Sequence, residues 1–173
     1  MMKKKTPGGF VLIELVATLV LIGIIGAFAG LFLYTGINGF IASKRNSETA
    51  LKAQIAMDRI STELRDIKSS PPPTFASKSV TYQGNTLPFT RKLEIETGPA
   101  GPGIYLTVNN VKNILLDNVD VANSSISYSA PNNLDYSGDG SKEISAIKVN
   151  FRFIEPNTPF EVSIYPRAFI TAP

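Results

Sequence analysis

The chain has 173 residues, with 17 lysines and arginines against 14 aspartates and glutamates, and it contains neither histidine nor cysteine. Without these two residue types it cannot build a Ser/His/Asp triad, a Cys/His pair, a disulfide or an imidazole or thiolate zinc site. Catalysis would have to rest on paired carboxylates or a Ser/Lys dyad, so the composition argues against an enzyme without excluding one.

Residues 1–9, with the sequence MMKKKTPGG, form a short basic leader. Its three lysines equal the whole formal net charge of +3. If the leader is removed, the remaining chain is neutral, so no basic patch indicates nucleic-acid binding. Pro7 and the Gly8–Gly9 pair would break a helix that entered from this side.

Residues 10–33 are largely apolar, and Glu14 is the only charged residue in this run. About 24 residues are enough to cross the hydrocarbon core of a membrane. A carboxylate at the bilayer centre costs roughly 3 kcal/mol, so Glu14 needs an explanation. The lysines ahead of the run hold the N-terminus in the cytoplasm. We therefore predict a single-pass membrane helix with the C-terminal domain outside the cytoplasm.

Residues 34–70 continue the helix in amphipathic form. Apolar residues recur every three or four positions, which is the period of a helix face. They are Ala50, Ala53, Met57, Ile60, Leu64 and Ile67. We expect this face to pack against the domain that follows, although a short coiled-coil dimer is an alternative. Arg59 and Glu63 form an i,i+4 pair, which is typical of a solvated helix face. Pro71 to Pro73 end the helix. The predicted helix-to-head packing residues are Met57, Ile60, Leu64 and Ile67.

Residues 71–173 form a β-rich head. Short runs rich in Val, Ile, Thr, Tyr and Phe are separated by Gly, Pro and Asn turn signals. The connections are too short for repeated βαβ units, so the sheet should be mostly antiparallel. The predicted class is α+β, a long N-terminal helix packed on an antiparallel sheet. Expected strands are SVTYQ, KLEIET, GIYLTV, SISYS, AIKVNFRFI and FEVSIYP, whereas VKNILLDNVDVAN is either a strand or a short helix and a strand.

Two ordinary explanations of the N-terminus compete with any specialised one. A secretory signal would be cut after Ala27-Phe28-Ala29 and leave a mature chain that begins at Gly30; an uncleaved anchor would keep Met1. The apolar run is longer than the usual signal core, contains Glu14, and continues beyond the supposed cleavage site. These features disfavour a secretory signal, and in an uncleaved anchor Glu14 would be an accidental acid.

The segment GFVLIE, in its context of basic leader and apolar span, resembles the class III signal of type IV pilins and type II secretion pseudopilins. The resemblance implies that a prepilin peptidase cuts between Gly9 and Phe10 and that the new N-terminus is methylated. It also implies partner pilin subunits, an inner-membrane assembly platform, and neither enzymatic activity nor a cofactor. The order of segments in the head is loosely similar to J-type minor pseudopilins and related minor pilins, although the cysteine pair of many major pilins is missing.

Cleavage before Phe10 would give Glu14 a cationic partner. The new amino group has a pKa near 8 and lies only four residues away in sequence. In the family that the segment GFVLIE resembles, the partner of this glutamate is implied to be the terminal amine of a neighbouring subunit. Such a buried pair specifies register more than it adds stability.

The segment DYSGDGSKE is a candidate calcium loop. Asp135, Ser137, Asp139 and Gly140 occupy positions 1, 3, 5 and 6 of the Asp-x-Asn/Asp-x-Asn/Asp-Gly pattern, with Ser137 a departure from it. Position 12 is Ala146, so Glu143 at position 9 would have to supply a carboxylate. The predicted calcium ligands are Asp135, Asp139 and Glu143, and a plain Asp-Gly turn is the alternative.

Two further carboxylate pairs have the spacing of acid/base groups, Glu94 with Glu96 and Asp117 with Asp120, but surface charge explains them as well. The sequence thus favours a structural subunit, a minor pseudopilin or minor pilin, held in the inner membrane until it joins a periplasmic or surface filament. The rival hypothesis is a signal-anchored exported protein whose β domain binds or hydrolyses a ligand.

Overall fold

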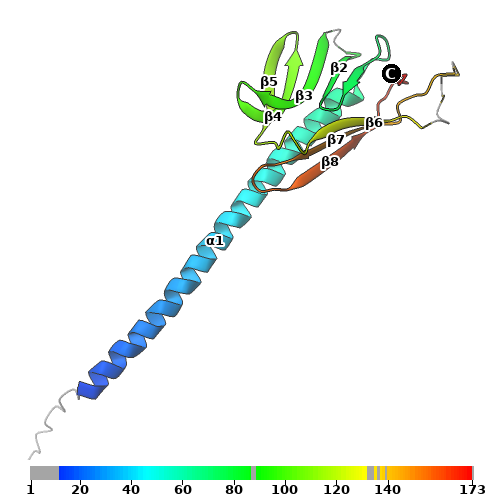
Figure 1. The fold of residues 1–173 in the computed structure, drawn as a ribbon. Coiled ribbons are helices and arrows are strands. Elements are labelled where there is room, and N and C mark those ends of the chain that lie inside the picture. Colours follow the sequence, from blue (N-terminus) through cyan, green and yellow to red (C-terminus); the bar gives the residue numbers. More distant parts are fainter. Residues whose placement is uncertain (1–11, 87–88, 132–134, 136, 139, 173) are drawn as a thin grey trace, which may run out of the picture. The chain divides into compact units, whose positions relative to one another are not determined.

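A computed structural model describes residues 12–86, 89–131, 135, 137–138 and 140–172. Within them it contains one α-helix followed by eight β-strands (Figure 1). The α+β class predicted from the sequence is confirmed. The elements are α1 (Leu12–Arg65), β1 (Thr74–Ala76), β2 (Ser79–Gln83), β3 (Thr90–Gly98), β4 (Gly101–Val108), β5 (Val111–Asp117), β6 (Ser125–Ser129), β7 (Ala146–Arg152) and β8 (Pro159–Ile164).

The chain divides into two compact units, Met1–Arg45 and Asn46–Pro173, and each is described by itself. In the first unit the described residues are helical, and every one of them is exposed. The second unit contains the last turns of α1 and all the described strands. The second unit alone buries side chains in a core.

The strands form two antiparallel sheets rather than the single sheet that the sequence suggested. The first has the order β1-β2-β3-β4-β5 and the second the order β6-β7-β8. The chain changes sheets at Val119, whose N–H donates to the carbonyl of Pro102 in β4 and whose backbone forms a bridge with Phe153 beyond β7. The next turn is stabilised by Asp120, whose carboxylate accepts the backbone N–H groups of Ala122 and Asn123.

The ambiguous run at 111–123 is therefore a strand, β5, followed by this turn. The helix ends at Arg65, slightly earlier than the sequence suggested. Beyond it, the Lys68 N–H donates to the carbonyl of Gln83, and Ile67 forms a bridge with Gly84. After Arg65 the backbone thus forms sheet-like hydrogen bonds with residues 83–84 in place of helical ones.

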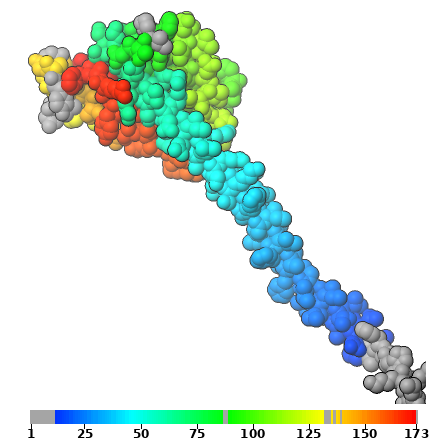
Figure 2. Space-filling model, turned by 180° about the vertical axis from the view of Figure 1, so that it is seen from behind, coloured from blue at the N-terminus to red at the C-terminus, as the bar shows by residue number. Residues whose placement is uncertain are grey.

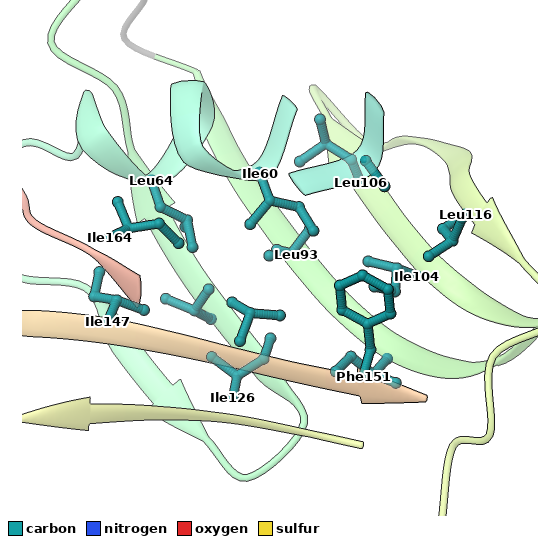
Figure 3. Close-up of a cluster of buried hydrophobic side chains, with 14 of the residues drawn as sticks. Ile60, Leu64, Leu93, Ile104, Leu106, Leu116, Ile126, Ile147, Phe151 and Ile164 are labelled. Atoms are coloured by element: carbon teal, nitrogen blue, oxygen red, sulfur yellow. The ribbon is translucent and has the colours of Figure 1, made fainter. Parts of the chain in front are cut away.

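The buried apolar side chains of the second unit form one cluster (Figure 3). It includes Ile60 and Leu64 of α1, together with Leu93 and Ile104 of the first sheet and Phe151 of the second. On α1, Ala53 and Ala56 are buried as well, whereas Ala50 is exposed. The remaining members include Val80, Ile95, Leu116, Ile126, Ile147, Val149, Phe153, Ile164 and Ile170.

Candidate functional site

The apolar part of α1 is the most distinctive surface of the first unit. Within the described residues, α1 is the one helix long and apolar enough to cross a membrane; its most apolar 18-residue window has a mean hydropathy of 2.6 and no buried residue. Large side chains such as Leu12, Phe28 and Phe32 are 83, 70 and 81 % exposed. A surface of this kind is stable only in lipid or against other apolar helices.

The polar groups inside this apolar segment are satisfied by the helix itself. The hydroxyl of Thr18 donates to the carbonyl of Leu15 at 2.9 Å, and that of Thr35 to the carbonyl of Leu31 at 3.0 Å. A helix that satisfies its own backbone and hydroxyl groups can enter hydrocarbon without unpaired donors. The carboxylate of Glu14 is the exception.

Glu14 lies in the first turn of α1, where the N-terminal end of the helix dipole favours a negative charge. Its side chain is exposed, and no residue of the described chain forms an ion pair with it. Gly9 and Phe10, the predicted cleavage residues, lie outside the described residues. The structure therefore presents Glu14 on an apolar helix with its charge available to a partner.

A second glutamate of the same helix has the opposite environment. Glu63 is 5 % exposed; the Arg59 guanidinium lies 2.6 Å from one carboxylate oxygen, and Arg91 of β3 contacts the other. The Tyr82 hydroxyl donates to Glu63 at 3.3 Å. Burial, and then the negative charge of Glu63, raise the pKa of the Tyr82 hydroxyl. The i,i+4 pair of Arg59 and Glu63 is thus not on a solvated face, because the sheet supplies Arg91.

The Glu94 and Glu96 pair belongs to an ion-pair network. Lys92 lies 2.6 Å from Glu94, and Lys112 lies 3.2 Å from Glu94 and 2.6 Å from Glu96. Burial alone would raise the pKa of Glu94, but the hydrogen bonds from Lys92 and Lys112 lower it. Hydrogen bonds to Glu96, and then to Glu94, raise the pKa of Lys112. The Glu94 carboxylate is therefore held in its charged form, and Glu96 shares Lys112 with it.

The Asp117 and Asp120 pair is divided between two structural contacts. Asp117 forms an exposed ion pair with Lys52 of α1 at 2.9 Å. Asp120 binds the turn after β5, and the Asn123 amide, which donates to it at 2.7 Å, lowers its pKa. These two carboxylates have separate partners and do not face one another as an acid and a base would.

The candidate calcium loop is partly described. The Asp135 carboxylate accepts the N–H groups of Gly138 at 2.8 Å and Gly140 at 2.9 Å, and Glu143, which is 2 % exposed, accepts the N–H of Ser137. Asp139 lies outside the described residues. Within the described residues no three acidic side chains gather as metal ligands. Calcium binding stays a prediction.

The predicted helix-to-head packing residues differ in burial, and one of them, Ile67, lies beyond the end of α1. Ile60, Leu64 and Ile67 are completely buried, and Met57 is partly buried against the core cluster. Leu51 and Ile55, on the same helix, remain 60 and 61 % exposed. One face of these helical turns is thus covered and the opposite face is free.

Comparisons with known proteins add no relative. No protein-family model matches the sequence, and neither a curated protein nor a solved structure matches the chain. The functional argument therefore rests on the residues themselves.

Proposed function

We propose that this chain is a structural subunit, a minor pseudopilin or minor pilin, of a type II secretion or type IV pilus filament. The observation that carries the proposal is the position of Glu14: an acid in the first turn of an uncovered apolar helix, four residues after Phe10 in the resembling motif GFVLIE.

Processing creates the partner that Glu14 lacks. Removal of residues 1–9 exposes an amino group with a pKa near 8, which is mostly protonated at neutral pH. Glu14 lies in the first turn of α1, so the carboxylate stays near the headgroups while the chain is in the membrane. In the filament, the amine of a neighbouring subunit neutralises it and sets the axial register between helices.

The apolar surface of α1 serves two environments in succession. In the inner membrane it contacts lipid, and in the filament the same side chains contact the helices of other subunits. In both environments apolar groups, rather than water, surround residues such as Leu19 and Phe28, which are 61 and 70 % exposed in the isolated chain. The membrane-bound chain and the assembled chain would therefore each cover the apolar surface of α1.

The second unit is the filament head in this proposal. The last turns of α1 share a buried cluster with residues of the β-strands, and the buried Glu63 contacts the half-exposed Arg59 of the same helix and Arg91 of β3. The head has a structural role, so the function requires no catalytic group. The proteins that act on the chain are a prepilin peptidase, which also methylates it, and an inner-membrane assembly platform.

The mature N-terminus tests the proposal. Mass spectrometry of the full chain from its native membrane should find N-methylated Phe10 at the start and residues 1–9 absent. A Gly9→Val variant, which alters the cleavage site and leaves the span intact, should remain unprocessed in the membrane. A chain that begins at Gly30 would support ordinary secretion, and one that keeps Met1 would support a simple anchor; either result overturns the filament proposal.

A further inference from the structure

The strand β5 is one outer edge of the first sheet, and within the described residues it pairs with β4 alone. Figure 1 shows it as the outermost strand of that sheet, and Figure 2 shows its yellow-green residues at the border of the second unit. Its first four residues, 111–114, are all exposed. An edge strand of this kind leaves a row of backbone N–H and C=O groups without a strand partner.

The turn before β5 fixes which backbone groups lie on its free edge. Asn109 and Asn110, the two residues between β4 and β5, have φ values of 49° and 64°. Positive φ at both positions is typical of a type I′ hairpin turn, in which the flanking residues form a hydrogen-bonded pair. Because such pairs alternate along an antiparallel ladder, the backbone groups of Lys112 and Ile114 point away from β4. The register shifts beyond Ile114, so the regular edge covers residues 111–114.

The outer strands β1, β6 and β8 each have a feature that opposes pairing with another chain. β1 has only three residues. β6 is partly covered, because the Ile126 N–H donates to the carbonyl of Ser77, just after β1, at 2.9 Å. β8 begins with Pro159, which has no N–H, and carries the exposed Glu161. Short strands, covered edges, prolines and charges are the usual protection of sheet edges.

Lys112 could protect the edge of β5 with its charge, but its side chain is turned back over the sheet. The Lys112 Nζ lies 2.6 Å from a carboxylate oxygen of Glu96 on β3 and 5.8 Å from the centre of the Tyr105 ring on β4. Asp117, the other charged residue of β5, pairs with Lys52 of α1 at 2.9 Å. Both charges of β5 are therefore paired within the chain, and its free edge presents backbone groups and apolar side chains.

Two exposed apolar side chains define what this edge accepts. Val111 is 60 % exposed and Ile114 is 40 % exposed. Because successive side chains of a strand alternate, these two residues lie on opposite faces of the sheet. A strand laid along β5 would cover both if it carried apolar residues at two positions three apart. Backbone donors and acceptors that recur every second residue match another extended backbone.

We propose that residues 111–114 of β5 bind an extended strand of a different filament subunit, which extends the first sheet beyond β5. The backbone groups of Lys112 and Ile114 pair with that strand, and its two apolar residues cover Val111 and Ile114. A minor subunit is scarce in its filament, so its neighbours are chains of other kinds. This inference rests on the proposed filament function and names the surface through which the head contacts a neighbour.

Amide hydrogen exchange at single-residue resolution tests the pairing. The processed full chain is compared in assembled filaments and alone in detergent. The amides of Lys112 and Ile114 should exchange about tenfold more slowly in filaments, the upper range for one added hydrogen bond. The amides of Val111 and Asn113, which point toward β4, should change little. A contact made by side chains alone would not produce this alternation.

A photoreactive amino acid in place of the exposed Asn113 identifies the bound strand. In assembled filaments the adduct should join the full chain to a different filament subunit, at a segment with apolar residues three apart.

Edge variants test whether the backbone carries the contact. Ile114→Pro removes an outward N–H and leaves the hydrogen bonds to β4 in place, so it should lower the adduct yield about tenfold. Ile114→Lys keeps the N–H but adds a charge to the edge, and it should lower the yield to a similar degree. The matched control is Ser163→Pro, at an exposed residue whose N–H points to the free edge of β8, and it should have no effect. Thermal melts of the detergent-solubilised chains confirm that each variant folds.

The inference is overturned by unchanged exchange of both amides in filaments, by adducts between two copies of this chain or with lipid, or by equal effects of Ile114→Pro and Ser163→Pro. The mature N-terminus is measured in the same sample. A chain that begins at Phe10 and enters filaments without protection of these amides contradicts only the contact at β5. An unprocessed chain contradicts the filament function itself.

Discussion

Glu14 and Glu63 are two glutamates of one helix with opposite surroundings. Glu63 is 5 % exposed and contacts two arginines and a tyrosine. Glu14 is exposed, lies among apolar residues, and has no ion-pair partner within the described chain. A buried carboxylate needs a cation and further hydrogen bonds. The fold supplies both to Glu63, whereas the described chain supplies no cation to Glu14; in the proposed function that cation is the processed N-terminus of a neighbouring subunit.

The same contrast extends to the apolar side chains. Ile60 and Leu64 are completely buried in the core, whereas the large apolar residues from Leu12 to Ile41 are at least 45 % exposed. The last turns of α1 contribute side chains to the same buried cluster as the strands. The first turns carry an exposed apolar surface that is stable only in lipid or against other apolar helices.

The largest effect should come from removing the last turns of α1. A fragment of residues 43–173 should be soluble and unfold cooperatively, whereas a fragment of residues 74–173 should aggregate. Met57, Ile60, Leu64 and Ile67 together contribute roughly 6 to 10 kcal/mol of burial, which is comparable with the whole stability of a small domain. Urea unfolding and light scattering measure both. Equal unfolding midpoints for the two fragments would show that the helix does not cover the strands.

Glu14→Leu should abolish assembly while the chain is still inserted and processed. In the proposed filament, each new N-terminal amine would enter the core without a carboxylate to pair with. An unpaired buried charge costs on the order of 3 to 5 kcal/mol. Crosslinking to partner subunits measures assembly. The matched control is Thr18→Val, one turn later, which removes a hydroxyl that the helix already satisfies. Wild-type incorporation of processed Glu14→Leu chains would assign the carboxylate another role.

Leu64→Ala should lower the free energy of unfolding of the second unit by about 2 to 5 kcal/mol, because it leaves a cavity among completely buried neighbours. Ile55→Ala is the matched control on the same helix, since Ile55 is 61 % exposed, and it should change stability by less than about 0.5 kcal/mol. Chemical unfolding of the detergent-solubilised chain compares the two. A similar loss from both variants would place the covered face elsewhere.

Arg91→Met should destabilise the second unit by about 2 kcal/mol. The variant leaves Glu63 buried with the single, half-exposed Arg59 as its cation, and the cost is therefore smaller than that of a fully unpaired charge. Arg91→Met with Glu63→Leu removes both charges and should recover most of the stability. A double variant less stable than Arg91→Met would contradict this account.

The smallest effect should be the pH dependence from Glu94. Its pKa is lowered in the folded chain by Lys92 and Lys112, so its contribution is complete above the unfolded pKa and is lost as pH falls through the lower, folded value. Glu94→Gln should therefore reduce acid destabilisation below about pH 4.5, by less than about 1 kcal/mol, since the network is partly exposed. Thermal melts between neutral and acidic pH measure it; an unchanged profile would show that Glu94 is not stabilised by its lysines.

The sequence predicted the α+β class and the antiparallel strands, because both follow from local patterns. The period of three or four residues found the buried positions Ile60 and Leu64, and alternation gave β2 and β6 with their observed bounds. It misjudged Ala50, which is exposed, and Ala56, which is buried. Alanine is small enough to fit on either face, so its pattern carries little information.

The sequence by itself determined the uncovered apolar helix and the acid in its first turn, since length, hydropathy and a single charge are properties of neighbouring residues. Only the tertiary structure decided that Glu63 is buried, that the strands divide into two sheets, and that Arg65 and Arg167 lie together at one end of the second unit. Each of these depends on a contact between residues far apart in the chain. The physical reason is that helical and strand periodicities report which face a residue occupies, whereas the partner on the opposing face is chosen by the packing of the whole core.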